Sequence, residues 1–389
     1  MTRHVRTAAV LAPLVVLALL AGCASPTVSE ASGEKRGGAS DAPDIASIIP
    51  EGDIVAASQQ LVDASIKARE GFTPPGDGPT AQQEGATVAY VGSDLTNGGI
   101  NAVADGVNEA AAAIGWKVTA FDGKATAQGR SDAMQQAISS APAAIIVGGF
   151  DPAEQAVVIK QAGDAGIPVV GWHAGPEPGG GNGLFTNVTT NPLDVSQLAA
   201  AYAVARSEGT AGVAIFTDGQ YEIAVLKAEA MEAYIQACPG CSVLEYQDSP
   251  ISESDQRMPG LVSNMLQAHA GKLSYLLAIN GNYFGGAQQA LRAAGSPPEG
   301  PPYSVAAGDG DAAEFQRIRN QDYQAATVAE PLYLQGWQLV DEVNRALAGD
   351  GPSSFVPRPG LVTIDNVPTG DVFDPDSGYR EIYLKSWGR

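Results

Sequence analysis

Apolar segments of strand length alternate with segments of helical periodicity along most of the chain, and this alternation limits the possible folds more than any other feature. The stretch 86–122 shows the pattern. An apolar run ends at Gly92, a helical pattern follows and closes at Gly115, and a second apolar run covers 118–121. Strands that alternate with helices pair in parallel and need helices on both faces of the sheet. The sequence therefore predicts an α/β fold.

The alternation continues to residue 364 and supplies more strands than one sheet comfortably holds. A loop rich in Gly and Pro at 174–183 and a polar segment at 186–191 interrupt it, which predicts that the chain crosses there between two lobes. Further strands are predicted at 144–150, 169–172, 212–216, 242–246, 275–279, 303–307, 325–328 and 361–364. Further helices are predicted at 153–165, 193–206, 224–237, 255–270, 284–294, 312–320 and 332–347.

Size and charge narrow the possible partners. A chain of 389 residues with 44% apolar content can bury a large core. Its net charge of −21 repels phosphate backbones, so we expect no nucleic-acid partner. We interpret the acidity as a solvated surface that favours solubility.

The first 22 residues resemble a bacterial lipoprotein signal peptide. Arg3 and Arg6 precede an apolar run at 8–20 that is too short to span a bilayer, and the sequence Leu-Ala-Gly-Cys then ends at Cys23. The resemblance implies a diacylglycerol on the Cys23 thiol, cleavage before this residue and a mature chain tethered outside the cytoplasm. The alternatives are an ordinary signal peptide with a chance cysteine or a membrane anchor.

Two further cysteines, Cys238 and Cys241, stand in the sequence Cys-Pro-Gly-Cys between a predicted helix and a predicted strand. Outside the cell this spacing favours a local disulfide across the turn. A redox motif of the thioredoxin type would open a helix after a strand, and no second pair of cysteines is present to complete a zinc site. We expect no metal site.

Several short patterns occur in an order and spacing that resemble the type I periplasmic sugar-binding proteins of bacterial ABC importers, the ribose-binding-like family. The resemblance covers residues 83–348 and implies two similar Rossmann-like lobes with parallel sheets, joined by a three-strand hinge and closing over one small ligand. The patterns are Gly106 in the first helix, Ala-Gly-Ile-Pro-Val-Val at 165–170, Leu-Ala-Ile-Asn at 277–280, Ala-Gly-Asp-Gly at 307–310, Ala-Thr-Val-Ala-Glu-Pro at 326–331 and Leu-Gln-Gly-Trp at 334–337.

The sequence and the resemblance together divide the chain into five parts. They are a signal peptide at 1–22, a flexible tether at 23–50, an N-terminal helical extension at 51–85, a first lobe at 86–187 plus 331–360, and a second lobe at 188–330 plus 361–389.

Ligand-binding residues are expected in the loops that leave the carboxyl ends of the strands, where parallel sheets place their ligand crevice. Neutral polyhydroxy ligands need carboxylates and amides for their hydroxyls and aromatic faces for their C–H surfaces. Matching strand ends to the family pattern nominates the polar residues Thr96, Asn97, His173, Lys227, Asn280, Asp309 and Glu330. Position along the predicted loops adds Asp94 and the aromatic residues Phe150, Trp172, Tyr221, Tyr283 and Phe284.

Two departures from the family pattern affect this site. The usual aromatic pair of the first loop is Gly99 and Ile100, and the usual Asp-Arg pair is His173 and Ala174. Some nominated residues also have structural interpretations. Asp309 and Asn280 suit the capping of helices, and Glu330, which stands just before a predicted helix, suits capping or interaction with the helix dipole.

No catalytic signature is present: the chain lacks the P-loop, the nucleophile-elbow and the zinc-protease motifs. We expect no catalytic residue and no cofactor. The resemblance implies a monomeric, lipid-anchored solute receptor outside the cytoplasm that delivers a sugar, a polyol or a similar small polar ligand to an ABC permease. The alternatives are a receptor that signals to a membrane sensor without transport and, more remotely, an exported α/β enzyme.

Overall fold

The computed structural model describes residues 43–68 and 70–389, which form two α/β lobes. The predicted signal peptide, the predicted lipidation site at Cys23 and most of the predicted tether lie outside the described residues. Among the residues described, no helix is long and apolar enough to cross a membrane.

The first lobe contains a six-stranded sheet in the order β2-β1-β3-β4-β6-β5, in which all pairs except β5 with β6 are parallel. Its strands are β1 (Thr87–Gly92), β2 (Lys117–Asp122), β3 (Ala144–Gly148), β4 (Val169–Trp172), β5 (Gly179–Gly181) and β6 (Leu184–Val188). Its helices are α2 (Gly98–Ala113), α3 (Ala127–Ser139), α4 (Ala156–Asp164), α10 (Leu332–Ala348) and α11 (Tyr379–Ser386).

The second lobe contains a six-stranded sheet in the order β12-β11-β10-β9-β7-β8, with only β12 antiparallel to its neighbour. Its strands are β7 (Gly212–Thr217), β8 (Ser242–Asp248), β9 (Tyr275–Ala278), β10 (Tyr303–Ala306), β11 (Ala326–Ala329) and β12 (Gly360–Thr363). Its helices are η1 (Ile45–Ile48), α1 (Ile54–Lys67), α5 (Pro192–Arg206), α6 (Glu222–Gln236), η2 (Ile251–Glu253), α7 (Ser254–Ala268), α8 (Tyr283–Ala293) and α9 (Ala312–Arg319).

Strand β1 shows why a continuous apolar run predicts a sheet covered on both faces. Val88 and Tyr90 pack on one side with α2, α10 and α11, whereas Ala89 and Val91 pack on the other side with α3 and α4. Successive side chains of a strand point to opposite faces, so a strand between two helical layers needs apolar residues at every position. The predicted α/β architecture with two lobes is confirmed.

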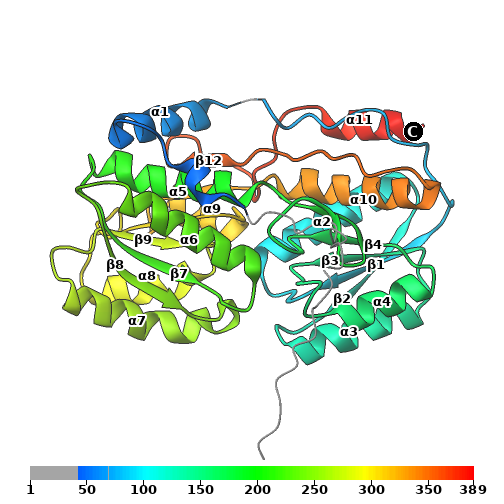
Figure 1. The fold of residues 1–389 in the computed structure, drawn as a ribbon, viewed down its shortest axis with the longest axis horizontal. Coiled ribbons are helices and arrows are strands. Elements are labelled where there is room, and N and C mark those ends of the chain that lie inside the picture. The colour runs from blue at the N-terminus through cyan, green and yellow to red at the C-terminus, as the bar shows by residue number, and fades with distance from the viewer. Residues whose placement is uncertain (1–42, 69) are drawn as a thin grey trace, which may run out of the picture. The chain divides into compact units, whose positions relative to one another are not determined.

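The signature glycines of the sequence explain how α2 and α10 pack together in the first lobe (Figure 1). A Cβ atom added to Gly106 would lie 2.9 Å from Cα of Tyr333, and one added to Gly336 would lie 2.6 Å from the carbonyl carbon of Gly106. The two backbones are therefore in direct contact, which only glycine permits at these positions.

Between β1 and β12 the chain crosses between the lobes three times. The crossings lie between β6 and α5, between β11 and α10, and between α10 and β12. This is the predicted three-strand hinge. The polar segment at 186–191 becomes the first crossing, where Asn191 caps α5 by accepting hydrogen bonds at its N-terminus.

The two ends of the described chain pack on different lobes, as Figure 1 shows for α1 beside α5 and α11 beside α10. Residues 361–389 were assigned to the second lobe, and β12 and the segment after it do pack there, where Arg319 of α9 donates to the carbonyls of Pro368 and Gly370. The end of the chain lies on the first lobe instead. Tyr379, Tyr383 and Trp387 of the C-terminal segment are buried against Trp337 of α10 in the first lobe. Burial of these large aromatic surfaces determines where the segment lies.

Two other local features differ from the predicted division. The predicted tether runs to residue 50, yet η1 already packs against the second lobe through the buried Ile48.

Helix α3 was not predicted, because its Gln-, Ser- and Asp-rich sequence shows little apolar periodicity. Cys238 and Cys241 are bonded to each other across the predicted turn.

Candidate functional site

A cleft lies where the carboxyl ends of the strands in the two sheets face each other. Every loop that contributes to it follows a strand, as expected for parallel sheets. The first lobe lines it with Ser93, Asp94, Asn97, Ile100, Ala125, Gly149, Trp172 and His173. The second lobe lines it with Asp218, Tyr221, Ile223, Ala224, Lys227, Ile251, Ser252, Ile279, Asn280 and Asp309.

Eight of the nominated residues line this cleft: Asp94, Asn97, Trp172, His173, Tyr221, Lys227, Asn280 and Asp309. The others lie elsewhere. Thr96 is exposed and donates its hydroxyl hydrogen to Asp94, while Phe150 is buried in the core of the first lobe. Tyr283 and Phe284 are buried in the second lobe, where the Tyr283 hydroxyl donates to the carbonyl of Ser249.

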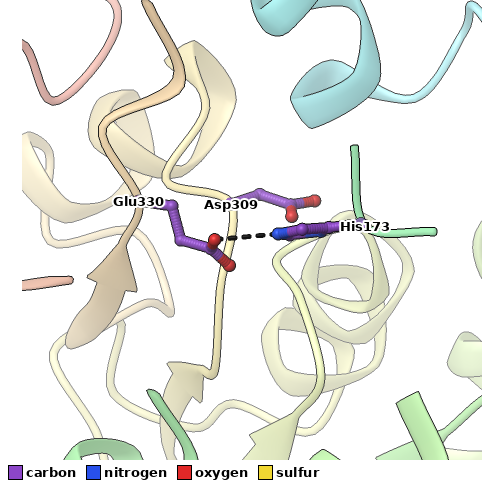
Figure 2. A group of neighbouring side chains, drawn as sticks. All are labelled: His173, Asp309 and Glu330. Atoms are coloured by element: carbon purple, nitrogen blue, oxygen red, sulfur yellow. Dashed lines mark hydrogen bonds and ion pairs between the residues drawn. The ribbon is translucent and has the colours of Figure 1, made fainter. Parts of the chain in front are cut away.

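Glu330 does not line the cleft but lies directly beneath it, where it joins both lobes and the hinge. Its Oε2 atom accepts from the Thr190 hydroxyl at 2.5 Å, from the Gln335 amide at 3.4 Å, and lies 2.8 Å from His173 Nε2. Its Oε1 atom accepts from Lys227 Nζ at 3.3 Å. Figure 2 shows the His173 ring directed at this carboxylate.

These contacts determine the charge of Glu330. Burial by itself would raise its pKa, but the charges of His173 and Lys227 and the hydrogen bonds from His173 and Thr190 hold the pKa far below its usual range. Glu330 is therefore an ionised carboxylate whose lone pairs are already occupied by the protein.

Asp309 is the second buried carboxyl group, and its side chain is 7% exposed. Within the described part of the chain, its carboxylate makes no hydrogen bond or ion pair to another side chain or backbone group. Burial raises its pKa well above the usual range, Lys227 offsets the rise only in part, and Glu330 adds to it. A buried polar group without a partner is unfavourable, so Asp309 offers acceptor oxygens that a ligand could use.

The departure from the family pattern in the first loop has a structural reason. A Cβ atom added to Gly99 would lie 2.6 Å from the carboxyl carbon of Asp309. The N-terminus of α2 in the first lobe thus approaches the Asp309 loop of the second lobe closely. A bulky side chain at position 99 would push this carboxylate away.

In both nominated amides, Asn97 and Asn280, the oxygen has a structural hydrogen bond and the nitrogen is free. Asn97 Oδ1 accepts from the backbone of Gly99 and Ile100 and so caps α2. Asn280 Oδ1 accepts from the backbone of Asn282 at 3.2 Å. Neither amide nitrogen has a hydrogen-bond acceptor among the residues described, so both remain donors at the cleft.

The remaining walls of the cleft are largely apolar. The rings of Trp172 and His173 stack at 3.9 Å between centroids, and Trp172 Nε1 donates to Gln335 at 3.0 Å, which fixes the stack. The isoleucines add aliphatic surface from both lobes: they are Ile100, Ile223, Ile251 and Ile279. Such surfaces suit the C–H faces of a small polar ligand.

Sequence reasoning also placed Ser93 in the first ligand loop, but it missed Asp218, Ser252 and these isoleucines. Asp218 directly follows β7, so the rule that nominated Asp309 would also have found it. In the structure Asp218 accepts from the backbone of Gln220 and Ile251 and thereby holds two loops of the second lobe together.

His173, Asp309 and Glu330 are close enough to be considered as a metal centre, since one ligand atom from each lies within 4.8 Å of the others. The Lys227 ammonium group, however, bonds to one oxygen of Glu330, and a cation there would be repelled. The group is better described as a charge network that surrounds one free carboxyl group.

A comparison with family models decides the relationship of this chain to known proteins. The model for the periplasmic binding protein domain matches residues 88–351. The chain belongs to this family. The resemblance inferred from short sequence patterns is thus confirmed, and the matched region spans both lobes of the periplasmic binding protein domain.

Solved structures show the same fold at low sequence identity. A sugar ABC transporter protein from Yersinia enterocolitica subsp. enterocolitica 8081 has a TM-score of 0.66 at 19% identity, covering 78% of this chain and 96% of its own. A solute-binding protein from Agrobacterium vitis bound with α-D-tagatopyranose has a TM-score of 0.64 at 18% identity, covering 73% and 96%. One from Bacillus halodurans C-125 with bound myo-inositol has a TM-score of 0.62 at 19% identity, covering 74% and 97%. No curated protein sequence matches the chain.

Proposed function

We propose that this periplasmic binding protein domain captures a sugar, a polyol or a similar small polar ligand outside the cytoplasm and delivers it to an ABC permease. The observation that carries the proposal is the free carboxyl group of Asp309, buried in the cleft between the lobes and accompanied by the amides of Asn97 and Asn280. Paired acceptors and donors of this kind bind vicinal hydroxyl groups. The sugar and the inositol bound by structural neighbours support this ligand class.

The ligand would be held from both sides. Asn97 and His173 belong to the first lobe, and Lys227, Asn280 and Asp309 belong to the second. A ligand that contacts both lobes stabilises the closed form relative to the open form, since it makes more contacts there. The permease would recognise this closed form. Binding and release need no covalent step, so we assign the chain no enzymatic role.

Glu330 has a supporting part in this mechanism. Its lone pairs are used by Thr190, His173, Lys227 and Gln335, so it orients His173 and Lys227 toward the cleft instead of receiving ligand hydroxyls itself. Because Glu330 lies at the second hinge crossing, it reaches His173 in the first lobe and Lys227 in the second.

The location and state of the protein complete the proposal. The lipobox-like sequence before Cys23 supports a lipid anchor on the cell membrane. We propose that the protein acts as a monomer, as the family resemblance implies.

Thermal unfolding tests the proposal. The chain carrying Cys23→Ser is heated with pentoses, hexoses, polyols, nucleosides and amino acids in turn. A ligand at about 100 times its Kd adds roughly 2.7 kcal/mol to the stability of the native state. We expect a sugar or polyol to raise the melting temperature, and Asp309→Asn to reduce this effect.

Asp376→Asn serves as the matched control, since Asp376 is exposed and distant in sequence from the cleft loops. It should leave the ligand effect unchanged. A response to amino acids or nucleosides alone, or no response to any sugar or polyol, would contradict the proposed ligand class.

A further inference from the structure

Arg130 is a fully buried cation on α3 of the first lobe that takes no direct part in lining the cleft. Its Nε and Nη2 atoms donate to the two carboxylate oxygens of Glu154 at 2.9 and 2.7 Å. Gln155 also donates to Glu154, at 3.1 Å. A bidentate pair of this kind holds the guanidinium plane in one orientation.

The free edge of this guanidinium reaches the other lobe. Nη1 donates to the Tyr221 hydroxyl at 3.4 Å, and the guanidinium carbon lies 5.7 Å from the centroid of the Tyr221 ring. Tyr221 precedes α6 of the second lobe and lines the cleft. Arg130 and Tyr221 therefore form a contact between the lobes at a wall of the ligand cleft.

The two sides of the contact differ in exposure. Arg130 is fully buried, whereas Tyr221 keeps intermediate exposure and the Glu154 side chain is 32% exposed. The contact therefore joins the buried interior of the first lobe to a partly exposed wall of the cleft in the second.

The ion pair makes the contact reversible. Arg130 and Glu154 both belong to the first lobe, so opening the cleft leaves neither charge without its partner. Only the hydrogen bond and the ring contact with Tyr221 are lost. Because the guanidinium is already oriented, closing the cleft does not require it to lose further conformational freedom.

We propose that Arg130 is a positioning residue for ligand capture: it holds Tyr221 at a wall of the cleft by a contact between the lobes and so favours the closed form of the two lobes. The inference rests on the proposed function for its purpose, but its test needs no ligand.

The test measures the distance between spin labels in the two lobes. Labels are attached at Gln136→Cys on α3 and Gln256→Cys on α7, both exposed positions, in the chain carrying Cys23→Ser. Distance distributions by electron double resonance then report the populations of closed and open forms. From the usual strength of a cation–π contact we expect Arg130→Met to lower the closed-to-open ratio about fivefold.

Arg292→Met is the matched control. Arg292 combines an ion pair with a ring contact within the second lobe alone: it donates to Asp322 at 3.0 Å, and its guanidinium carbon lies 5.6 Å from the centroid of the Tyr323 ring. Its loss should leave the label distances unchanged. Equal distributions for Arg130→Met and Arg292→Met would overturn the inference.

Tyr221→Leu covers the case in which Arg130→Met fails to fold, because it removes the contact and leaves the Arg130–Glu154 pair intact. The same shift toward the open form is expected, and an unchanged distribution would overturn the inference. Arg130→Lys, which keeps the charge but not the fork, should restore part of the closed population. A negative result in the sugar experiment would bear on the proposed function and leave this measurement unaffected.

Discussion

Two neighbouring loops of the second lobe each end a strand with a buried carboxyl group, yet the two groups differ in almost every physical respect. Glu330, after β11, has four hydrogen-bonding partners from both lobes and the hinge, and its pKa is depressed. Asp309, after β10, has no such partner among the described residues, and its pKa is raised. The difference separates a group that the fold needs from a group that the ligand needs.

The comparison also explains why the two groups can be buried close together, Asp309 in the wall of the cleft and Glu330 beneath it. The positive charge of Lys227 stabilises Glu330 through a direct contact and reaches Asp309 only through space. Two equally ionised carboxylates would repel each other in a site of low dielectric constant. Four predictions follow from the contrast, in order of expected effect.

The largest effect concerns stability. Glu330→Gln should lower the free energy of unfolding by about 3–5 kcal/mol, because it leaves the buried Lys227 ammonium without its counter-charge. Urea denaturation at pH 7 measures it. Glu330→Gln combined with Lys227→Met should recover part of the loss. If Glu330→Gln proved as stable as Asp309→Asn, the distinction between a structural and a ligand-binding carboxyl group would be wrong.

The second effect concerns ligand affinity. Asp309→Asn should weaken sugar or polyol binding by about 1.5–3 kcal/mol, roughly 10- to 150-fold, because hydrogen bonds to a charged acceptor are lost. Its stability without ligand should not fall at pH 7, since the carboxyl group makes no hydrogen bond or ion pair among the described residues that the substitution could break. Calorimetric titration and urea denaturation give the two values. A loss of stability equal to that of Glu330→Gln would indicate a structural role for Asp309.

The third effect has opposite signs for the two carboxyl groups. The folded pKa of Glu330 is below its ordinary value of 4.5, so its stabilising contribution is complete above that pH and is lost as the pH falls below it. The folded pKa of Asp309 is above its ordinary value of 3.8, so its ionisation destabilises the protein at neutral pH, and acidification toward 3.8 relieves this cost.

Unfolding free energies between pH 3 and pH 7 check both signs. The advantage of the wild type over Glu330→Gln should shrink below about pH 4.5. The advantage of Asp309→Asn over the wild type should shrink as the pH falls from 7, with a slope of at most about 1.4 kcal/mol per pH unit. Parallel curves for the two pairs would show that the groups have similar environments.

The smallest effect concerns the contribution of one hydrogen bond to Glu330, the bond from Thr190, to the stability of the protein. Thr190→Val removes one of its hydrogen bonds while keeping the shape of the side chain, and should cost about 1.5 kcal/mol of stability. Thr189→Val is the control, because the Thr189 hydroxyl donates to the carbonyl of its neighbour Thr190 and does not reach Glu330. A larger cost for Thr189→Val than for Thr190→Val would argue against Glu330 as the centre of the network.

The parts of the site that sequence predicted well are those determined by position along a strand. Asn97, His173, Asn280 and Asp309 all follow strands, and the carboxyl ends of parallel strands converge on one edge. Position alone could not separate side chains that enter the cleft from those that pack beneath it. Tyr283 follows β9 as Asn280 does, yet it opens α8 and is buried in the second lobe.

Arg130 illustrates a residue that no local pattern could identify. It lies on a helix without clear apolar periodicity, and its contact with Tyr221 joins residues 91 positions apart in the sequence. Whether a charged residue on a helix faces solvent or another lobe depends on how the lobes meet. That arrangement is a property of the packed molecule.

The sequence by itself determined the α/β architecture, the two lobes and the family, because strand and helix periods, caps and glycines act on neighbouring residues. Only the tertiary structure decided what each carboxyl group does. Glu330 contacts His173, which is 157 positions away in the sequence, and Lys227, which is 103 positions away. These contacts keep the Glu330 carboxyl group ionised. Electrostatic energies depend on burial and on separation in space, which arise only when distant segments pack together.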